Sequence, residues 1–211
     1  VRLVQTGAYL GALGELTIED GRVVASRRLD KLPCRGGKCG AVEVAERELL
    51  ARVDAWLGVK LAESTLTLCR DGGRPGVYGE TNLGDFVTDA TYWYVNAHEP
   101  GGCDVALCNY AGVRADAAPG PFTLRQANEI APFGNGICVL EVTGAQLRDA
   151  LEWGARKAPG YVGGFLHCAG LKYAIETVRP STVAQVDARW TGGPTNDVYR
   201  VTDIEVYDRA V

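Results

Sequence analysis

The stretch that decides the fold spans residues 104–114 and reads DVALCNYAGVR. Its first half is a short apolar run, which is typical of a buried strand. Its second half carries Asn109 and Gly112 ahead of Arg114, and this composition predicts a turn where the strand ends. Backbone N–H groups are exposed at such a turn, and a guanidinium can hold an anion by two hydrogen bonds. We therefore expect a ligand site at this turn.

The residues before this strand predict a helix that starts near residue 82. Thr81 or Asn82 can cap the helix through a side-chain oxygen. Apolar residues then recur with the spacing of one helical face, at Leu83, Phe86, Val87, Ala90 and Tyr94. A short strand over residues 66–69 is expected ahead of this helix.

The residues after the turn alternate between predicted helices and strands. A small helix is expected over 124–130, a strand over 137–142, and a helix over 143–157 that opens with a capping box of Thr143 and Gln146. Alternation of apolar and polar residues predicts strands within 165–176 and 198–207. Because helices and strands interleave, we expect a mixed α/β (α+β) fold with a mixed sheet flanked by helices.

The N-terminal part predicts a hairpin followed by a helix. Strands over 13–18 and 23–26 flank a turn at Asp20 and Gly21, which is a hairpin signal. The apolar positions between residues 42 and 57 follow helical spacing.

Charge and hydropathy exclude two classes of partner. The chain has 211 residues and a formal net charge of -4, whereas binding a nucleic acid polymer needs a concentrated basic surface. The sequence also lacks an apolar run of the roughly 18 residues that a membrane helix needs, so no membrane span is expected.

Seven cysteines and two histidines limit the metal chemistry of this chain. Cys34 and Cys39 flank a polar loop and are the candidates for a disulfide. No metal site is expected, because His98 and His167 are the only histidines and a zinc site would need a second ligand pair. Four further cysteines lie in or beside apolar runs, where a free thiol acts as a small hydrophobe: Cys103, Cys108, Cys138 and Cys168.

A third segment, APFGN at residues 131–135, presents an aromatic ring in a loop. Phe133 lies between Pro132 and Gly134, so its ring can offer a flat face for stacking against a purine-sized ring. Each of these residues taken alone has a simpler interpretation. Arg114 would be a surface charge, Phe133 a core residue and Asn109 a turn residue.

Taken together and in this order, the motifs resemble the 5'-nucleotidase C-terminal domain family. The motifs that carry the resemblance are ETNLGDFVTDA (80–90), NYAGVR (109–114), PFGN (132–135), TGAQLRDALE (143–152) and GGFLHCAGL (163–171). Residues 1–25 resemble the last hairpin of the metallophosphatase domain that precedes this domain in the family. The resemblance implies a hairpin remnant and loop over 1–40, a connecting helix over 41–64, and a substrate-binding domain over 65–211 that is truncated at its end.

The resemblance also implies an activity for the parent protein. Members of the family hydrolyse phosphate esters with two divalent metal ions held by the N-terminal metallophosphatase domain. The parent is therefore expected to be a phosphoric-ester hydrolase of the 5'-nucleotidase, UDP-sugar hydrolase or cyclic-nucleotide phosphodiesterase type, and this chain alone is expected to be inactive. Its expected partners are a small nucleoside or nucleotide and that N-terminal domain. The family suggests a secreted, periplasmic or cell-surface location.

Carried over by motif, the substrate-binding residues are Asn109, Gly112, Arg114 and Phe133, with Arg74, Tyr110 and Asn135 as further candidates. No catalytic residue is expected in this chain. Tyr110 and Ala111 stand where the family has glycines, which predicts a reshaped pocket. Val77 stands where the family has an arginine, and Arg74 is the nearest substitute. The closing segment of the family, with the second aromatic of its base clamp, is expected beyond Val211.

Two other interpretations stay open at this point. The chain can be a non-catalytic ligand-binding or structural module of the same fold with a remodelled pocket. Its parent can also act on a non-nucleotide ester or a thiosulfate-type conjugate.

Overall fold

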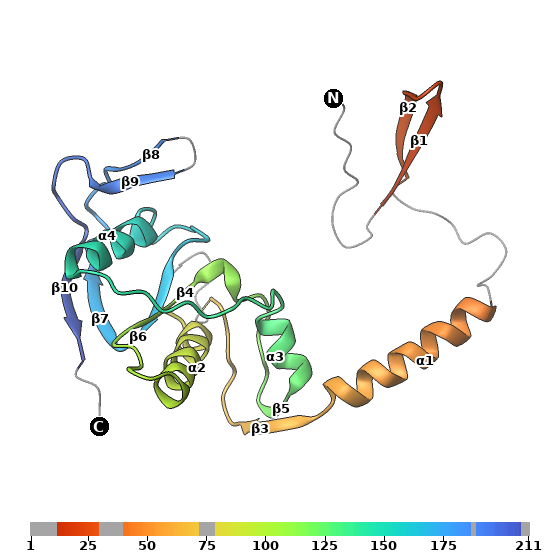
Figure 1. Ribbon diagram of the computed structural model, residues 1–211, viewed down its shortest axis with the longest axis horizontal. Coiled ribbons are helices and arrows are strands. Elements are labelled where there is room, and N and C mark those ends of the chain that lie inside the picture. The colour runs from red at the N-terminus through yellow and green to blue at the C-terminus, as the bar shows by residue number, and fades with distance from the viewer. Residues whose placement is uncertain (1–11, 30–39, 72–78, 187–188, 208–211) are drawn as a thin grey trace. The chain divides into compact units, whose positions relative to one another are not determined.

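The computed structural model describes residues 12–29, 40–71, 79–186 and 189–207 (Figure 1). The chain divides into two compact units, residues 1–53 and 54–211, and each is described by itself. The predicted disulfide partners Cys34 and Cys39 and the candidate Arg74 lie outside the described residues.

The first unit contains the predicted hairpin. Strands β1 (Leu13–Glu19) and β2 (Arg22–Leu29) pair antiparallel. Asp20 and Gly21 form the turn with φ values of 47° and 72°, and aspartate and glycine are the residues that tolerate this left-handed backbone. Helix α1 (Gly40–Leu57) begins in this unit, as its spacing predicted, and none of its residues is buried.

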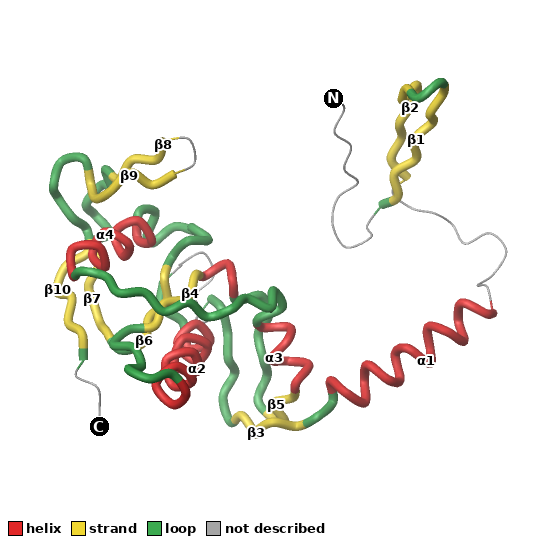
Figure 2. Tube along the Cα trace, in the orientation of Figure 1, coloured by secondary structure: helices red, strands yellow, loops and turns green. Residues whose placement is uncertain are grey.

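The second unit interleaves helices and strands (Figure 2). Its elements are β3 (Lys60–Ser64), α2 (Asn82–His98), β4 (Ala106–Asn109), the 3-10 helix η1 (Tyr110–Gly112), β5 (Gly120–Thr123), α3 (Leu124–Ile130), α4 (Gly144–Ala155), β6 (Leu166–Ala169), β7 (Leu171–Ile175), β8 (Val183–Val186), β9 (Arg189–Pro194) and β10 (Val201–Val206). The mixed α/β class is confirmed. Within the described part, the strands pair two by two and antiparallel, as β3 with β5, β4 with β6, β7 with β10 and β8 with β9.

One hydrophobic cluster holds α2 against the turn after β4 and against α3. The helix begins where the sequence predicted, because the Thr81 hydroxyl accepts a hydrogen bond from the Gly84 N–H at 3.1 Å. Leu83, in the first turn, is fully buried. It packs with the other members of this cluster, Val113, Ala117, Phe122 and Ile130.

A second cluster joins α4 to β7 and β10 through Leu151, Ala155, Leu171 and Val201. The capping box of Thr143 and Gln146 starts α4 as predicted. Cys108 of β4 packs on the first cluster, and Val105 packs on the second. The pair formed by β4 and β6 therefore lies between the two clusters.

A buried carboxylate and a buried guanidinium fix the C-terminal strand to α4. Glu152 is fully buried, and its Oε2 accepts hydrogen bonds from the backbone N–H groups of Arg200 and Val201 at 2.8 and 2.9 Å. The Arg200 guanidinium donates to the carbonyl oxygens of Ala155 and Ala158. These bonds pair the Arg200 guanidinium and one oxygen of the Glu152 carboxylate, whereas the buried Glu152 Oε1 has no hydrogen-bond partner among the described residues.

Two predicted strands are wrong. Residues 66–69 form only an isolated bridge between Leu68 and Ala117. The backbone N–H of Cys69 instead donates to Asn82 Oδ1 at 3.0 Å, so a side chain takes the place of a strand ladder. Residues 137–142 carry the apolar pattern of a strand but have no strand partner among the described residues.

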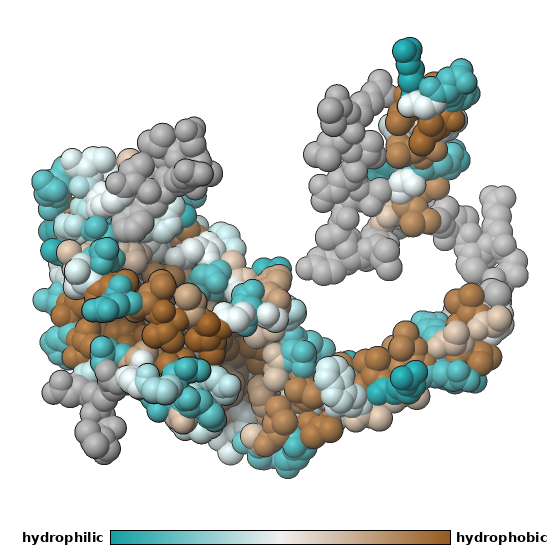
Figure 3. Space-filling model, viewed as in Figure 1, coloured by the Kyte–Doolittle hydropathy of each residue, from teal (hydrophilic) through white to brown (hydrophobic). Residues whose placement is uncertain are grey.

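The segment 137–142 instead crosses the surface of the second unit with its apolar side chains exposed. Leu140 is 74% exposed, and Ile137, Val139 and Val142 are each more than half exposed. Figure 3 shows a broad hydrophobic area on the face of the unit that this segment crosses in Figure 1. Because the segment 137–142 pairs with no strand among the described residues, its apolar side chains stay exposed.

Gly84 in the first turn of α2 allows the helix to approach β6 closely. A Cβ built on Gly84 would lie 2.2 Å from Nδ1 of His167, a buried residue of β6. No real side chain fits at that distance, so the packing of α2 on β6 requires glycine here.

We predict that Gly84→Ala destabilises the protein by about 1–3 kcal/mol, because the added methyl group must displace a buried ring. Gly144→Ala is the matched control, since Gly144 also lies in the first turn of a helix and has nothing within 4 Å of its built Cβ. That control should keep or raise stability by up to about 1 kcal/mol. Urea denaturation measures both changes, and equal effects at the two positions would contradict the close approach.

Candidate functional site

The turn at the end of β4 is held by backbone hydrogen bonds to the segment that leads into β6. The Tyr110 N–H donates to the carbonyl oxygen of Phe165 at 2.8 Å, and the Ala111 N–H donates to that of Gly163 at 3.0 Å. The side-chain amide of Asn109 donates to the same Gly163 carbonyl at 3.3 Å. The position of the turn is thus fixed on one side.

The other side of the turn is fixed by α3. The backbone N–H of Arg114 donates to the carbonyl oxygen of Ile130, the last residue of α3, at 2.8 Å. Within the turn, a Cβ on Gly112 would lie 3.1 Å from Asn109 Oδ1, so a side chain at position 112 would crowd the Asn109 amide. The turn therefore needs a small residue at Gly112.

This arrangement brings Arg114 beside Phe133. The Arg114 Cζ atom lies 5.8 Å from the centre of the Phe133 ring, within the range of a cation–π contact. Phe133 is 57% exposed, so it is not a core residue. The following residue, Gly134, has a φ of 59°, a backbone conformation that favours glycine. The ring therefore stands at the surface with a guanidinium at its side.

The Arg114 guanidinium is available to an anion. It donates one long hydrogen bond, of 3.4 Å, to the carbonyl oxygen of Ala111. No ion pair joins it to a carboxylate within the part of the chain that the structure describes. A guanidinium without a carboxylate partner can bind a phosphate or carboxylate group of a ligand.

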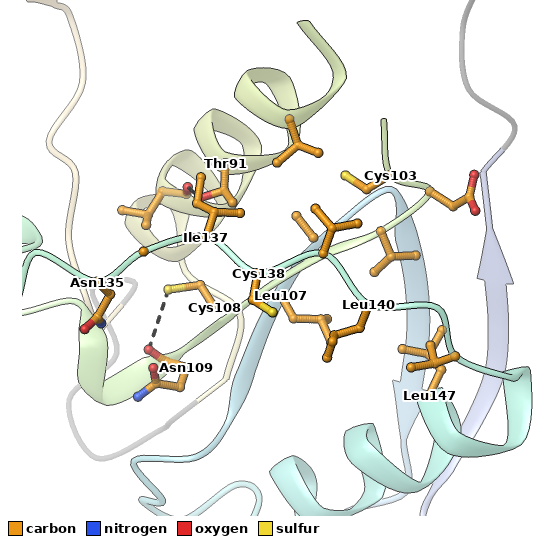
Figure 4. A pocket seen from close by; sticks show the side chains of 18 of the residues that line it. Thr91, Cys103, Leu107, Cys108, Asn109, Asn135, Ile137, Cys138, Leu140 and Leu147 are labelled. Carbon is orange, nitrogen blue, oxygen red and sulfur yellow. Dashed lines mark hydrogen bonds between the residues drawn. The ribbon is translucent and has the colours of Figure 1, made fainter. Parts of the chain in front are cut away.

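A cavity of about 1030 Å³ opens next to this pair. Its walls are α2, the length of β4 and the segment 131–144 (Figure 4). Mostly apolar side chains line it, among them Val87, Leu107 and Leu140, while Asn109 and Asn135 lie together at one end. Such a lining suits a ligand with an apolar or aromatic body and a few polar groups.

The structure brings most of the predicted site residues to this end of the cavity. Asn109, Gly112, Phe133 and Asn135 line the cavity, and Arg114 adjoins it through Phe133. Tyr110 does not line it. Sequence reasoning missed the α2 wall, formed by Val87, Thr91 and Val95, because their helical spacing predicts only a core-facing side.

Tyr110 supports the turn instead of filling the pocket. Its ring stacks on His167 at 5.7 Å between centroids and meets Tyr161 edge-on at 5.8 Å. Its hydroxyl donates to the carbonyl oxygen of Arg70 at 3.1 Å. The tyrosine that replaces a glycine of the family thus packs toward β6.

Three of the four cysteines that were predicted to act as small hydrophobes are half-buried, and the fourth is exposed. Cys103, Cys108 and Cys168 are half-buried, in keeping with their expected role as small hydrophobes. Cys138 is exposed, because the segment 137–142 that carries it is not a paired strand. Three of these thiols, on Cys103, Cys108 and Cys138, line the cavity.

The described part of the chain offers neither a cluster of metal ligands nor a membrane-spanning helix. No group of three His, Cys, Asp or Glu side chains there is arranged to hold a metal ion. None of the helices found there has the length and apolar character to cross a membrane.

Known proteins share this sequence pattern. The family described as the 5'-nucleotidase C-terminal domain matches residues 61–209. A trifunctional nucleotide phosphoesterase of Bacillus subtilis is 33% identical over 129 residues, which cover 58% of this chain and 9% of that protein. A cell wall protein of Listeria monocytogenes is 34% identical over 104 residues, which cover 46% of this chain and 12% of that protein. The chain therefore corresponds to a small share of the length of these relatives.

A solved structure also shares the fold. The 5'-nucleotidase precursor from Thermus thermophilus aligns with a TM-score of 0.61 at 28% sequence identity, over 92% of this chain and 35% of that chain. The similarity extends over the mixed α/β arrangement described above.

His167, which supports Tyr110, gives the fold a measurable pH dependence. Burial lowers the pKa of His167 from 6.5 to about 4, and its Nδ1 has no hydrogen-bond partner among the described residues. The unfolded chain therefore takes up a proton as the pH falls below 6.5, whereas the folded protein does so only near pH 4. Stability is consequently lost as the pH falls through this window.

We predict that wild-type stability falls relative to that of His167→Phe by about 1 kcal/mol for each pH unit between pH 6 and 4.5. Phenylalanine keeps a ring at this position and removes the titration. Burial also raises the pKa of Asp85 to about 6 and acts in the opposite direction, but this effect is common to both proteins and cancels in the difference. Urea denaturation at several pH values checks the result. His98→Gln, on an exposed residue, is the control that should follow wild type, and parallel curves for wild type and His167→Phe would contradict the prediction.

Proposed function

Because this chain belongs to the 5'-nucleotidase C-terminal domain family, we propose that the site at Arg114 and Phe133 binds the nucleotide that a parent phosphohydrolase hydrolyses, through its nucleoside and its phosphate. The observation that carries the proposal is the position of the Arg114 guanidinium, which has no carboxylate partner among the described residues, 5.8 Å from the centre of the exposed Phe133 ring. These two side chains match the two parts of a nucleotide, because a nucleotide combines an aromatic base with an anionic phosphate.

The base would stack on Phe133. The ring is more than half exposed and forms part of the cavity wall. Stacking of a base on an aromatic side chain contributes about 1–3 kcal/mol. The amides of Asn109 and Asn135, at the same end of the cavity, can then donate to or accept from polar groups of the base or ribose.

The phosphate would bind to Arg114. Its guanidinium keeps donors free for an anion, and the turn that carries it is fixed by the bond of its own backbone to Ile130. A charge-assisted hydrogen bond of this kind contributes about 1.5–3 kcal/mol. The two contacts together orient a nucleotide with its base over the ring and its phosphate toward the guanidinium.

The chemical step belongs to another part of the parent protein. The residues described in this chain offer no cluster of metal ligands, so none of them is assigned to the two divalent metal ions that the family uses. We propose an N-terminal metallophosphatase domain as the partner that holds these ions. The share of 35% that this chain covers of the Thermus thermophilus protein leaves room for such a domain.

An exported location fits the relatives. One of them is a cell wall protein, and the solved relative is a nucleotidase precursor. We propose that the parent acts outside the cytoplasm, in secreted, periplasmic or cell-surface form.

The two halves of the site can be separated by titration with adenosine 5'-monophosphate and with adenosine. Phe133→Ala should weaken both ligands by about tenfold or more, because both lose the stacking contact. Arg114→Ala should weaken the monophosphate by about tenfold or more and leave adenosine unchanged, because only the phosphate contacts the guanidinium. Chemical-shift perturbation of the complete 211-residue chain measures the affinity of each ligand for wild type and for both variants.

Matched substitutions of residues that do not line the cavity are the controls. Arg47→Ala on α1 and Trp93→Ala on α2 remove an exposed arginine and an exposed aromatic residue that do not line the cavity. They should bind both ligands as wild type does. The proposed function would be overturned if Phe133→Ala and Arg114→Ala bound both ligands with wild-type affinity. It would also be overturned if millimolar nucleotide caused no saturable chemical-shift change in wild type.

A further inference from the structure

The cavity extends beyond the residues that hold the nucleotide in the proposed function. Its volume of about 1030 Å³ lies at the upper limit of the roughly 300–1,000 Å³ that pockets for drug-sized ligands have. Asn109 and Asn135 lie at one end, which we call the asparagine end (Figure 4). Phe133 lines the cavity, whereas Arg114 beside it does not. A nucleotide with its base on Phe133 and its phosphate at Arg114 therefore fills one end of the cavity and leaves room at the other.

The opposite end of the cavity, which we call the aliphatic end, is lined by leucines from three segments. Figure 4 shows Leu140, on the segment 135–142, and Leu147, on α4, toward this end, with Leu107 of β4 nearer the middle. Leu140 is 74% exposed, and Leu107 is also exposed. The apolar surface of the aliphatic end is therefore open to a ligand, and burial of exposed apolar surface is what favours binding of an apolar group.

The charges of the cavity walls exclude an anionic group at the aliphatic end. Among the described residues that line the cavity, Asp104 and Glu141 are the charged ones, and no lysine, arginine or histidine lines it. Asp104 precedes β4, at the end of that strand away from Asn109, and Glu141 follows Leu140. A carboxylate or a second phosphate placed here would meet charges of its own sign without a cation to bind it. An uncharged apolar group fits these walls.

We propose that the aliphatic end binds an uncharged apolar substituent on the base of the nucleotide. The base is the part that carries the substituent, because Phe133 lines the cavity and the phosphate contact Arg114 lies outside it. The ligand class that this cavity prefers is thus a nucleoside monophosphate with an apolar extension of its base. This inference rests on the proposed function, since the contacts at the asparagine end and at Arg114 hold the rest of the molecule.

The expected gain follows from the apolar surface that leaves water. Each methylene group that is buried on binding strengthens the affinity about fourfold. A benzyl group buried over half of its surface therefore adds about tenfold. The wall formed by β4 and α2 is held by the packing of the first hydrophobic cluster, so this part of the site exists before the ligand binds.

Titration of the complete 211-residue chain with three nucleotides tests the proposal. Adenosine 5'-monophosphate is compared with its N6-benzyl and its 2-benzylthio derivatives, which extend the base from two different edges. We expect at least one derivative to bind about tenfold tighter than the unsubstituted nucleotide. Intermolecular nuclear Overhauser effects should connect its benzyl protons with methyl groups of Leu107, Leu140 or Leu147.

Two leucine variants locate the gain. Leu140→Gln should reduce the advantage of the substituted nucleotide to less than about threefold, because the amide keeps water at the aliphatic end. Leu66→Gln is the matched control, since Leu66 is also exposed and does not line the cavity, and it should keep the full advantage. Both leucines are more than 60% exposed, and circular dichroism confirms that each variant is folded.

Three results would overturn the proposal. The first is that neither derivative binds at least about threefold tighter than adenosine 5'-monophosphate. The second is an advantage that persists in Leu140→Gln, and the third is that the benzyl protons contact only residues outside the aliphatic end. In each case, binding of the unsubstituted nucleotide that still depends on Arg114 and Phe133 would leave the proposed function standing, so the two failures are distinguishable.

Discussion

The hydrogen bond from the Arg114 N–H to the Ile130 carbonyl oxygen, at 2.8 Å, joins the turn after β4 to the end of α3. Phe133 follows Ile130 by three residues, so this bond also sets the distance between the guanidinium and the ring. On its other side, the turn is held by the bonds of Tyr110 and Ala111 to the segment before β6. The turn is therefore fixed by backbone groups and by one side-chain bond, from the Asn109 amide to the Gly163 carbonyl oxygen, and this fixed turn positions the Arg114 guanidinium beside the Phe133 ring.

The two hydrophobic clusters pack against the elements that carry this turn. The cluster around Leu83 holds α2 and α3, and the cluster around Leu151 holds α4 and β10, with β4 and β6 between them. The close contact of Gly84 with His167 lets α2 approach this strand pair, and the stacking of His167 on Tyr110 extends that packing to the turn. One wall of the cavity is thus a well-packed part of the fold, whereas the backbone of the segment 135–142, which forms the other wall, has no hydrogen bond to another element among the described residues.

The sequence predicts the locally encoded features well. Capping side chains start α2 and α4 at the predicted residues, and the turn residues Asp20 and Gly21 close the first hairpin. Residues whose partners are distant in sequence were harder to predict. Strands β3 and β5 are short, and they pair with each other across about 60 residues, so neither carries a strong local signal. The segment 137–142 is the opposite case, because its apolar pattern predicts a strand for which the structure offers no partner among the residues it describes.

The sequence allowed the residues of the candidate site to be predicted, but not the directions of their side chains or the walls of the cavity. The order of the motifs points to Asn109, Arg114 and Phe133, and the structure brings the last two together. The direction of the Tyr110 ring could not be predicted, because it depends on His167, more than 50 residues further along the chain. The α2 wall of the cavity was missed for a similar reason, since an apolar helical face looks the same whether it meets a core or a cavity.

The most direct test of this account is a double-mutant cycle between Arg114 and Phe133, read as the affinity for adenosine 5'-monophosphate. If the two side chains hold one nucleotide between them, the loss in Arg114→Ala/Phe133→Ala should differ from the sum of the single losses by about 0.5 kcal/mol or more. Losses that add to within about 0.3 kcal/mol, or single variants that bind as wild type does, would contradict the account, because the two residues would then act separately or outside the site.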